Sequence, residues 1–283
     1  MKITVVGARG VVGSAVANYF YSLGHDITRL DIKKGEGITT DIMKAYPGVD
    51  MIFVCVPTPS KLDGSCDLSF VEKVTTDIGR VISFENCPVN VVYKSTMPPG
   101  STAQMEKILK RYCRRMRVAY NPEFLRQRFA LEDMMTPSRI AVGSTDKVFA
   151  EEVMSLYEVA DCRKDIYDTY EGAELVKYYA NCYYASRISF FNQMKLFADK
   201  FGCDHDKIVK SIVADESVGL HGSNPTGKPY GGACLPKDVA AIIACGKKNM
   251  VDVRLLEDVD RMNRIIATVK DNKGSKITQW GVV

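Results

Sequence analysis

The chain has 283 residues, enough for two domains of ordinary size, each with its own hydrophobic core. Its residues are 46% hydrophobic and 25% charged, as in a soluble globular protein, and a net charge of +4 does not indicate nucleic-acid binding. No apolar segment reaches the roughly 18 residues of a membrane-spanning helix, and the first residues resemble a strand rather than a signal peptide. We therefore expect a cytoplasmic protein that binds neither membranes nor nucleic acid.

The first 164 residues alternate short apolar segments with stretches of helical length. Strands are expected at residues 2–7, 25–31, 50–57, 89–95, 117–123 and 138–143. The segment 52–56, Ile-Phe-Val-Cys-Val, is apolar at every position, which is typical of a parallel strand covered on both faces. Residues 1–164 are therefore predicted to form an α/β domain with a Rossmann-type, doubly wound parallel sheet.

From residue 165 onward the pattern is helical. A long helix is expected over 169–202, followed by helices near 204–213, 236–247 and 252–271, with a Gly/Pro-rich loop at 219–233. Apolar residues within 252–271 recur on one helical face, which could pack on the domain core or form the seam of a dimer. Residues 165–283 are predicted to be an all-helical central domain with a short C-terminal tail.

Nine cysteines are spread along the chain, and none belongs to a Cys-x-x-Cys pair. Their spacing fits neither a zinc site nor a disulfide framework, so no metal is expected and most should be reduced, buried thiols. The sequence Cys-Asp-His-Asp at 203–206 is better explained as a polar loop between helices than as a metal site. Only Cys234 has neighbours that suggest chemistry.

Three glycines separate the first strand from the next helix: Gly7, Gly10 and Gly13. Glycine allows the backbone to approach a pyrophosphate, and the helix start at Val11 and Val12 offers free N–H groups. Asp31 follows the second strand, where a carboxylate can accept the ribose 2′-OH and repel a 2′-phosphate. The pattern predicts a dinucleotide site that prefers NAD to NADP; a tight turn that serves only packing is the alternative.

A second cluster lies at 231–238, Gly-Gly-Ala-Cys-Leu-Pro-Lys-Asp. With Pro236 at the first position of a helix, Cys234 would precede the helix N-terminus, where the helix dipole and Lys237 favour the thiolate. Asp238 could act as a base or orient a water molecule. From these residues alone, Cys234 could be a nucleophile or a buried structural cysteine.

Other polar residues occupy positions that suggest a site. Lys177 and Asn181 are four residues apart in the long helix, within an aromatic and apolar run, where a lysine must find an anion or reach the surface. Thr58, Thr96 and Glu123 follow predicted strands, and ligands of doubly wound sheets bind at the carboxyl ends of strands. Each of these three could instead be a turn residue.

Several motifs together resemble the nucleotide-sugar 6-dehydrogenases, whose best-known member is UDP-glucose 6-dehydrogenase. They occur in the order and at the spacing typical of that family, over nearly the whole chain: VPTP (56–59), KSTMPPGST (94–102), NPEFLR (121–126), PSRIAVG (137–143), AELVKYYAN (173–181), RISFFN (187–192) and GGACLPKD (231–238). The combination of GGACLPKD with NPEFL is highly specific, whereas the glycine loop is not.

The resemblance implies oxidation of the sugar C6 hydroxyl to a carboxylate, with two hydrides passed to two NAD. It makes Cys234 the nucleophile of a thiohemiacetal and then a thioester, which water hydrolyses. It implies that Lys177 stabilises the developing oxyanion, and that Asn181 holds the hydroxyl oxygen and the sugar. The remaining predicted catalytic residues, for protons and the attacking water, are Asp238, Glu123 and Thr96.

The predicted binding residues fall into two groups. NAD is expected to contact Gly7, Gly10, Val11, Val12, Gly13, Asp31, Thr58, Thr96, Gln127 and Lys237. The nucleotide sugar is expected to contact Glu123, Lys177, Asn181, the backbone of Phe124 and Leu125, and the loop up to Tyr230 and Gly231. The expected reaction is UDP-glucose to UDP-glucuronate, and the expected assembly is a homodimer through the central helical domain.

The sequence departs from the family pattern in three places. Gln127 replaces a second glutamate, and residues 215–219 lack an arginine that is common there. The family has a third, nucleotide-binding domain, which we do not expect in this chain; residues 274–283 look like a single strand, so a second chain could supply nucleotide binding. Two other functions stay open: a two-electron, hydroxyacid-type dehydrogenase that uses Lys177 and Asn181, and an NAD-binding subunit that needs a partner chain.

Overall fold

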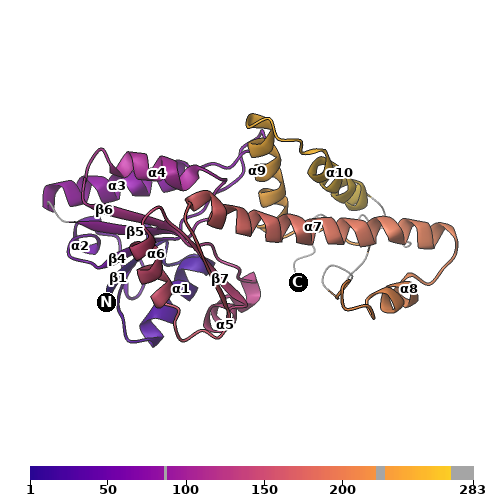
Figure 1. Cartoon of the computed structure of the whole chain (residues 1–283), viewed down its shortest axis with the longest axis horizontal. Helices are drawn as coiled ribbons and strands as arrows, with labels where there is room; N and C mark the ends of the chain where they lie inside the picture. The colour runs from indigo at the N-terminus through magenta and orange to yellow at the C-terminus, as the bar shows by residue number, and fades with distance from the viewer. Residues whose placement is uncertain (86–87, 221–226, 269–283) are drawn as a thin grey trace. The chain divides into compact units, whose positions relative to one another are not determined.

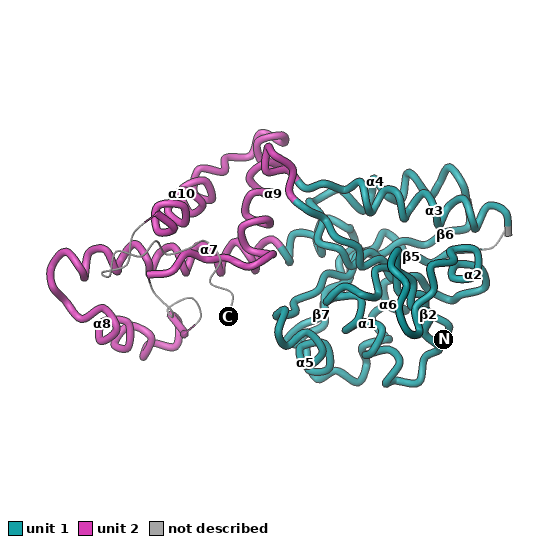
Figure 2. Tube along the Cα trace, turned by 180° about the vertical axis from the view of Figure 1, so that it is seen from behind, with its two compact units in different colours: residues 1–59, 66–177 teal, residues 60–65, 178–283 magenta. Residues whose placement is uncertain are grey.

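The computed structural model describes residues 1–85, 88–220 and 227–268 (Figure 1). The chain divides into two compact units, shown in Figure 2. Unit 1 comprises residues 1–59 and 66–177, and unit 2 comprises residues 60–65 and 178–283. The expected strand at 274–283 lies outside the described residues. A division into domains at 164/165 stays a prediction.

Unit 1 contains an eight-stranded sheet with the order β3-β2-β1-β4-β5-β6-β7-β8. Its strands are β1 (Lys2–Val6), β2 (Asp26–Leu30), β3 (Ile38–Thr39), β4 (Met51–Val54), β5 (Val89–Tyr93), β6 (Met116–Tyr120), β7 (Arg139–Gly143) and β8 (Arg163–Tyr167). The register places Ile3 beside Ile27 on one side and Met51 on the other. Pairing is parallel except between β6 and β7, which meet antiparallel at Tyr120 and Gly143. This arrangement confirms the predicted doubly wound, Rossmann-type α/β fold.

Helices cover both faces of this sheet (Figure 1). The helices of unit 1 are α1 (Val11–Ser22), α2 (Ile42–Ala45), α3 (Ser69–Glu85), α4 (Ser101–Leu109), α5 (Ala130–Met135) and α6 (Lys147–Ser155), with a 3₁₀ turn η1 (Gln127–Phe129). One core cluster packs Phe20 of α1 and Phe149 of α6 against Phe53 of β4. A second cluster packs Ile78 of α3 and Met105 of α4 against the other face. Burial on both faces explains why the central strands are apolar at nearly every position.

Unit 2 is helical, as predicted. Its elements are the greater part of α7 (Tyr170–Lys200), α8 (His205–Ile212), α9 (Leu235–Lys248) and α10 (Arg254–Thr268). Its core joins Cys182 and Ala185 of α7 to Val239 of α9 and Val259 of α10. Of the apolar face predicted for residues 252–271, Leu256 and Val259 therefore pack on the core of unit 2, whereas Leu255 is exposed. None of the helices within the described ranges is both long and apolar enough to span a membrane.

The buried carboxylate of Glu174 joins the start of α7 to the N-terminus of α4. Gly100, the N-cap residue of α4, has no side chain to accept a hydrogen bond. Glu174 takes that role: it accepts from Gly100 N (2.7 Å), Thr102 N (2.8 Å) and Thr102 Oγ1 (2.7 Å). The carboxylate thereby satisfies backbone groups that a helix end would otherwise leave unpaired. Burial nevertheless raises the pKa of Glu174 to about 7, against the effect of these hydrogen bonds.

We expect Glu174 to make the stability of unit 1 depend on pH. The pKa of Glu174 is higher in the folded than in the unfolded chain, so the protonated carboxyl group stabilises the fold. This stabilisation is complete when the pH is below the pKa of the unfolded chain, and it is lost as the pH rises through about 7. Between pH 5 and 8 the free energy of unfolding should fall by on the order of 1 kcal/mol more in the wild type than in Glu174→Gln. Urea titrations at several pH values measure this difference. Parallel pH profiles for the two proteins would contradict it.

Candidate active site

The glycine loop between β1 and α1 is built as the sequence predicts. Gly7 has a φ of 79°, and a Cβ there would lie 2.6 Å from the carbonyl oxygen of Cys55. A Cβ at Gly13 would overlap the Gly7 carbonyl, so α1 can approach the loop only with glycine at this position. Gly10 is the N-cap of α1, without a side-chain cap and without an acidic residue in the first turn. The first turn of α1, with Val11 exposed, therefore suits the diphosphate of a dinucleotide.

Asp31 is held next to this loop, immediately after β2. Its carboxylate accepts hydrogen bonds from Arg9 N (3.0 Å) and Lys33 N (3.1 Å). The Arg9 guanidinium in turn donates to the carbonyl of Lys34 (2.8 Å). The structure thus brings Asp31 to the glycine loop, as a ribose-binding carboxylate requires. Arg9 was not singled out in the sequence, because an arginine inside a glycine loop has no distinctive spacing.

Thr58 and Thr96 lie where β4 and β5 end. The Thr58 hydroxyl donates to the carbonyl of Thr96 (2.7 Å), and Ser95 Oγ donates to the carbonyl of Val56 (2.7 Å). These bonds tie the two strand exits together at the carboxyl edge of the sheet. Thr58 is buried and Thr96 is half-buried. Both occupy the region of a doubly wound sheet where ligands bind.

A buried ion pair connects the exit of β6 to α7 within unit 1. Lys177 Nζ lies 2.8 Å from Glu123 Oε1, and the two side chains are only 5% and 8% exposed. Glu123 Oε2 also accepts from the backbone N–H of Leu125 (2.6 Å), which curls the chain around the carboxylate. The Phe124 ring lies 5.8 Å from Lys177 Nζ and 4.0 Å from the guanidinium carbon of Arg139. Four predicted site residues, Glu123, Phe124, Leu125 and Lys177, are therefore brought together.

Unit 2 contains a second polar cluster. Asn181 Nδ2 donates to Asp238 Oδ2 (2.5 Å), and Asp238 is fully buried. Lys237 Nζ lies 2.6 Å from Asp238 Oδ1, but the angles do not suit a hydrogen bond. Among the described residues these last two atoms are buried and have no hydrogen-bond partner. Buried polar atoms of this kind call for a water molecule or a ligand.

Cys234 is the N-cap residue of α9 and is exposed. The helix begins at Leu235, so Pro236 is its second residue and not the first, as the sequence predicts. The prediction for Pro236 is therefore wrong by one position. The Cys234 carbonyl accepts from Asp238 N (2.8 Å), so thiol and carboxylate belong to the same first turn. Cys55 and Cys182 differ from it: burial raises the pKa of each thiol to about 12, as for structural cysteines.

The positions of the remaining predicted site residues, Gln127, Tyr230 and Gly231, give less indication of a functional role. Gln127 is exposed at the start of η1. Tyr230 is buried, and its backbone is paired with Asn263, through Tyr230 N to Asn263 Oδ1 (2.7 Å) and Asn263 Nδ2 to Tyr230 O (3.0 Å). Gly231, half-buried, continues from it toward Cys234. Residues 221–226 of the predicted substrate loop lie outside the described residues.

Two asparagines that the sequence did not single out hold the chain ahead of Cys234. Besides Asn263, Asn192 of α7 accepts from Gly227 N (2.6 Å) and donates to the carbonyl of Lys228 (2.7 Å). Asn192 is almost completely buried. Asn192 belongs to the RISFFN motif, so its position in that motif was the available signal. Asn263 lies in a charged helix and gave none.

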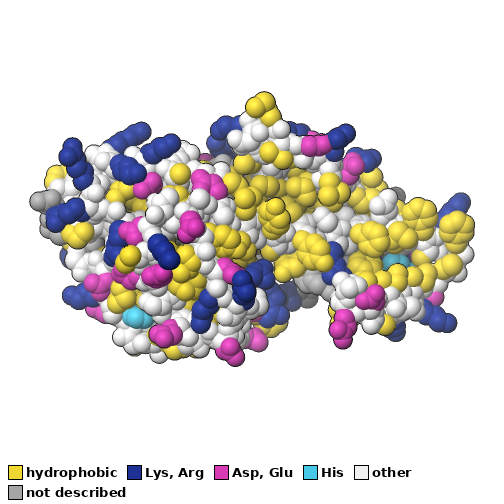
Figure 3. Space-filling model, viewed as in Figure 1, with side chains coloured by type: hydrophobic (Ala, Val, Ile, Leu, Met, Phe, Trp, Pro, Cys, Tyr) yellow, Lys and Arg dark blue, Asp and Glu magenta, His cyan; other side chains and the backbone are white. Residues whose placement is uncertain are grey.

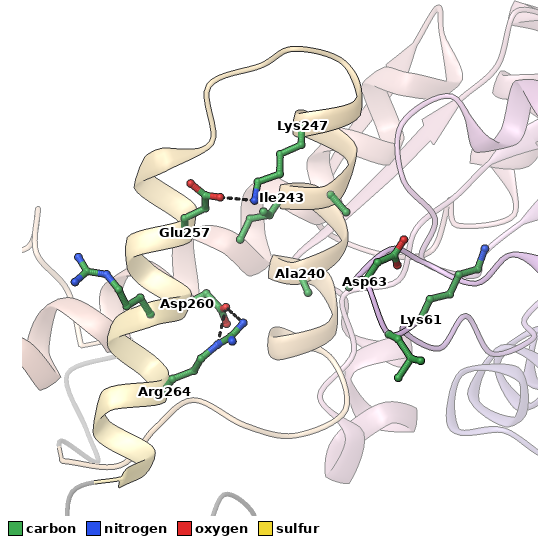
Figure 4. A pocket seen from close by; sticks show the side chains of 12 residues that line it. Lys61, Asp63, Ala240, Ile243, Lys247, Glu257, Asp260 and Arg264 are labelled. Carbon is green, nitrogen blue, oxygen red and sulfur yellow. Dashed lines mark hydrogen bonds and ion pairs between the residues drawn. The ribbon is translucent and has the colours of Figure 1, made fainter.

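A hollow of about 570 Å³ in unit 2 contains none of the predicted site residues (Figure 4). It lies between α9, α10 and residues 61–64. Two ion pairs, Lys247 with Glu257 (2.5 Å) and Arg264 with Asp260 (2.5 Å), occupy its rim. In the part of the chain that the structure describes, no group of three or more His, Cys, Asp or Glu side chains could hold a metal ion.

Comparison with known proteins agrees with this architecture. Residues 34–161 match the NAD binding domain, and residues 171–265 the central domain, of the UDP-glucose/GDP-mannose dehydrogenase family. GDP-mannose 6-dehydrogenase of Pseudomonas syringae pv. tomato is 31% identical over 93% of the chain and 68% of its own length. UDP-glucose 6-dehydrogenase of Rickettsia bellii is 31% identical over 100% and 73%. The structure of a UDP-glucose dehydrogenase from Pyrobaculum islandicum superposes with a TM-score of 0.88 at 30% identity, covering 93% and 68%.

The chain therefore belongs to the UDP-glucose/GDP-mannose dehydrogenase family, a family of nucleotide-sugar dehydrogenases that use NAD. NAD is the cofactor, and the uncapped helix start beside Asp31 fits its diphosphate and ribose. The chain spans 68% of the length of the Pseudomonas enzyme.

The buried Lys177–Glu123 pair leads to a prediction on stability. Lys177→Met leaves a carboxylate buried without its partner, which should lower the free energy of unfolding by about 3–5 kcal/mol. The double variant Lys177→Met/Glu123→Gln removes both charges, so it should be more stable than Lys177→Met alone. Denaturant titrations of the wild type, both single variants and the double variant measure this coupling. Additive effects of the two substitutions would show that the ions do not interact.

Proposed function

We propose that the protein oxidises the C6 hydroxyl of a nucleotide sugar to a carboxylate, with UDP-glucose as substrate and UDP-glucuronate as product. Two successive oxidations are required, and one NAD accepts a hydride in each. Overall, an alcohol, two NAD and one water become a carboxylate, two NADH and three protons. The family membership supports the reaction class, and the chemistry of the side chains supports the four-electron course.

The observation that carries the proposal is the first turn of α9. An exposed thiol at its N-cap, Cys234, is followed within the turn by Lys237 and Asp238, whose buried polar atoms include two without a hydrogen-bond partner in the described chain. A helix N-terminus favours the thiolate over the thiol. A nucleophile beside polar atoms that can order a water is what the second oxidation and the final hydrolysis need.

In the first oxidation the hydroxyl loses its proton and C6 loses a hydride, which gives an aldehyde. Asp238 takes up the proton through an ordered water, and Asn181, already bonded to Asp238, holds the hydroxyl oxygen. Lys177 donates to the developing oxyanion. The ion pair with Glu123 would hold the Lys177 ammonium in place for this role and compensate its buried charge.

The sulfur of Cys234 then adds to the aldehyde carbon. A C–S bond forms, the carbonyl oxygen takes a proton, and the product is a thiohemiacetal. Loss of the second hydride and of the hydroxyl proton converts it to a thioester. Water, oriented by Glu123 and Thr96, attacks the thioester carbon; the C–S bond breaks, the carboxylate leaves and the thiolate is restored. Covalent capture keeps the reactive aldehyde from escaping between the oxidations.

The same proposal assigns the binding residues. NAD would be held by the glycine loop and first turn of α1, by Asp31, by Thr58 and Thr96, and further by Gln127 and Lys237. The sugar and its phosphates would be held by the backbone of Phe124 and Leu125 and by the chain leading to Gly231. Since Asn263 already occupies the backbone groups of Tyr230, this residue would contribute its side chain.

The decisive experiment counts NADH. Purified protein with NAD and a panel of UDP- and GDP-sugars should form two NADH for each sugar oxidised by the wild type. Cys234→Ser should complete at most the first oxidation and lose steady-state turnover by roughly 100-fold or more. Cys203→Ser, which changes another exposed cysteine, is the matched control and should behave as the wild type.

Other outcomes would replace the proposal. One NADH per substrate, unchanged in Cys234→Ala, would identify a two-electron, hydroxyacid-type dehydrogenase that uses Lys177 and Asn181. Turnover that needs a second polypeptide would identify an NAD-binding subunit completed by a partner chain. No turnover with any sugar by the intact protein would contradict the proposal itself.

We further propose that unit 2 pairs with a second copy of the chain through α7 and α8. Three aromatic residues of α7 repeat at intervals of seven and are about half exposed: Tyr183 (54%), Phe190 (53%) and Phe197 (54%). Exposed apolar residues of α8, Ile208 and Ile212, extend this set. Figure 3 shows hydrophobic side chains gathered over the part of unit 2 that contains these helices. A seven-residue apolar repeat on an exposed helix is typical of a helix–helix interface.

Sedimentation velocity tests this pairing. The wild type should sediment as a dimer, and Phe190→Glu, which puts a charge in the apolar row, should shift it to a monomer with at least a tenfold weaker dimerisation constant. Phe84→Glu is the matched control, because Phe84 is an exposed phenylalanine of unit 1 (80%). The same distribution of species for both variants would rule out this surface.

A further inference from the structure

A buried lysine that the proposed mechanism does not use lies beneath Glu123. Lys94 directly follows β5 and is 3% exposed. Its ammonium donates to Asn121 Oδ1 (2.8 Å) and lies within 3.4–3.5 Å of three further oxygens: the carbonyls of Asn121 and Pro122, and the hydroxyl of Tyr157. An ion of this kind is too costly to bury without a set of acceptors arranged for it.

Asn121 is held by hydrogen bonds of both its side chain and its backbone N–H. Its Oδ1 accepts from Lys94 and from the Tyr157 hydroxyl (2.6 Å). Its Nδ2 donates to the carbonyl of Ala141 in β7 (2.8 Å), and its backbone N–H to the carbonyl of Tyr93 in β5 (2.9 Å). The amide therefore joins the exits of β5 and β6 to β7, where β6 and β7 themselves share only one residue pair.

The segment held in this way leads directly to the carboxylate that pairs with Lys177. Lys94 contacts the carbonyls of residues 121 and 122, and Glu123 is the next residue. Pro122 further restricts the backbone of Asn121. Glu123 then has its two oxygens aimed in fixed directions, toward Lys177 Nζ and Leu125 N. We propose that Lys94 is a positioning residue, which fixes the main chain at 121–123 and thereby aims the Glu123 carboxylate at its partners during turnover.

The charges around Lys94 supply a pH signature. Burial lowers the pKa of Lys94 to about 8; Cys55 and Glu123 act in the opposite direction, and Lys177 adds to the lowering. The neutral Tyr157 and Asn121 complete its surroundings. Lys94 is thus charged at pH 7 and loses its proton as pH rises through about 8, which leaves a neutral amine with two N–H donors in place of the three of the ammonium, among the same four oxygens.

The inference rests on the proposed function for its kinetic test. Lys94→Met should lower kcat/KM for the sugar by roughly 10-fold to 100-fold at pH 7, the cost of a small misplacement of a reacting group. The ratio of wild type to variant should shrink between pH 7 and 9.5, as the wild type loses the Lys94 charge. Tyr157→Phe, which keeps the charge and removes one donor to Asn121, should show a smaller loss that persists across this range.

Thr75→Val is the matched control. Thr75 is a buried hydroxyl that bonds to Tyr93, the residue before Lys94, on the opposite face of the sheet. Its loss should lower stability and leave the pH profile unchanged. A Lys94→Met variant whose kcat/KM stays within twofold of the wild type, or whose ratio to wild type is independent of pH, would overturn the inference.

Amide exchange tests the same inference without turnover. The Leu125 N–H is bonded to Glu123 Oε2, so its exchange reports how firmly the carboxylate is held. Exchange of residues 121–126, followed by mass spectrometry at pH 7, should be roughly tenfold faster in Lys94→Met than in wild type and unchanged in Thr75→Val. Equal exchange in Lys94→Met and wild type would refute the positioning role even if no sugar is oxidised. Faster exchange without any turnover would retain it and reject the proposed function.

Discussion

The cost of burying charge governs the polar part of unit 1. Lys177 and Glu123 are both almost completely removed from water, and each ion is tolerable only because the other lies 2.8 Å away. Replacing such a pair by apolar residues often costs little, so stability alone gives no reason for these two ions. The proposed chemistry needs such an arrangement, a cation and a carboxylate in fixed positions at the edge of a sheet. Lys94 and Asn121, behind the pair, serve the same need.

Unit 2 also buries a carboxylate, Asp238, but its polar neighbours satisfy it less completely. Asp238 is buried and receives one good hydrogen bond, from Asn181, while its other oxygen faces Lys237 at an unsuitable angle. Unit 1 compensates its buried charges internally, whereas the start of α9 leaves polar atoms for a water or a ligand. The exposed thiol of Cys234 belongs to the same helical turn as these polar atoms, Lys237 Nζ and Asp238 Oδ1.

The sequence predicts most of the fold because buried parallel strands carry a strong signal. All six expected strands exist, while β3 and β8 were missed: β3 has two residues, and β8, Arg-Lys-Asp-Ile-Tyr, is polar and partly exposed at the sheet edge. The four helices expected after residue 165 are present to within a few residues, the last of them as far as residue 268, where the described part of the chain ends. Of the predicted site residues, Lys177 contacts Glu123 in unit 1 and Asn181 contacts Asp238 in unit 2, while their catalytic roles stay predictions.

The residues that orient the site could not be found in the same way. Lys94 reads as an ordinary polar residue at a strand exit, and only the packing of Tyr157 and Asn121 around it reveals a buried ion. Glu174 caps a helix that begins 73 residues earlier in the chain, at Ser101, and no local pattern reports such a contact. Asn263 reaches Tyr230 across unit 2. Long-range hydrogen bonds leave no periodic trace in a sequence.

The division of the polypeptide between the units has a consequence for how such a protein can be rebuilt. Residues 60–65 leave unit 1 and return to it, and α7 passes from one unit into the other without a break. Neither unit is a continuous piece of chain with ends of its own. A recombinant exchange at a single crossover between residues 66 and 177 would combine residues 60–65 of one parent with the unit 2 helices of the other, and a crossover near residue 177 would also fall within α7. To exchange one unit between two parents without the other, residues 60–65 must be transferred together with the rest of unit 2.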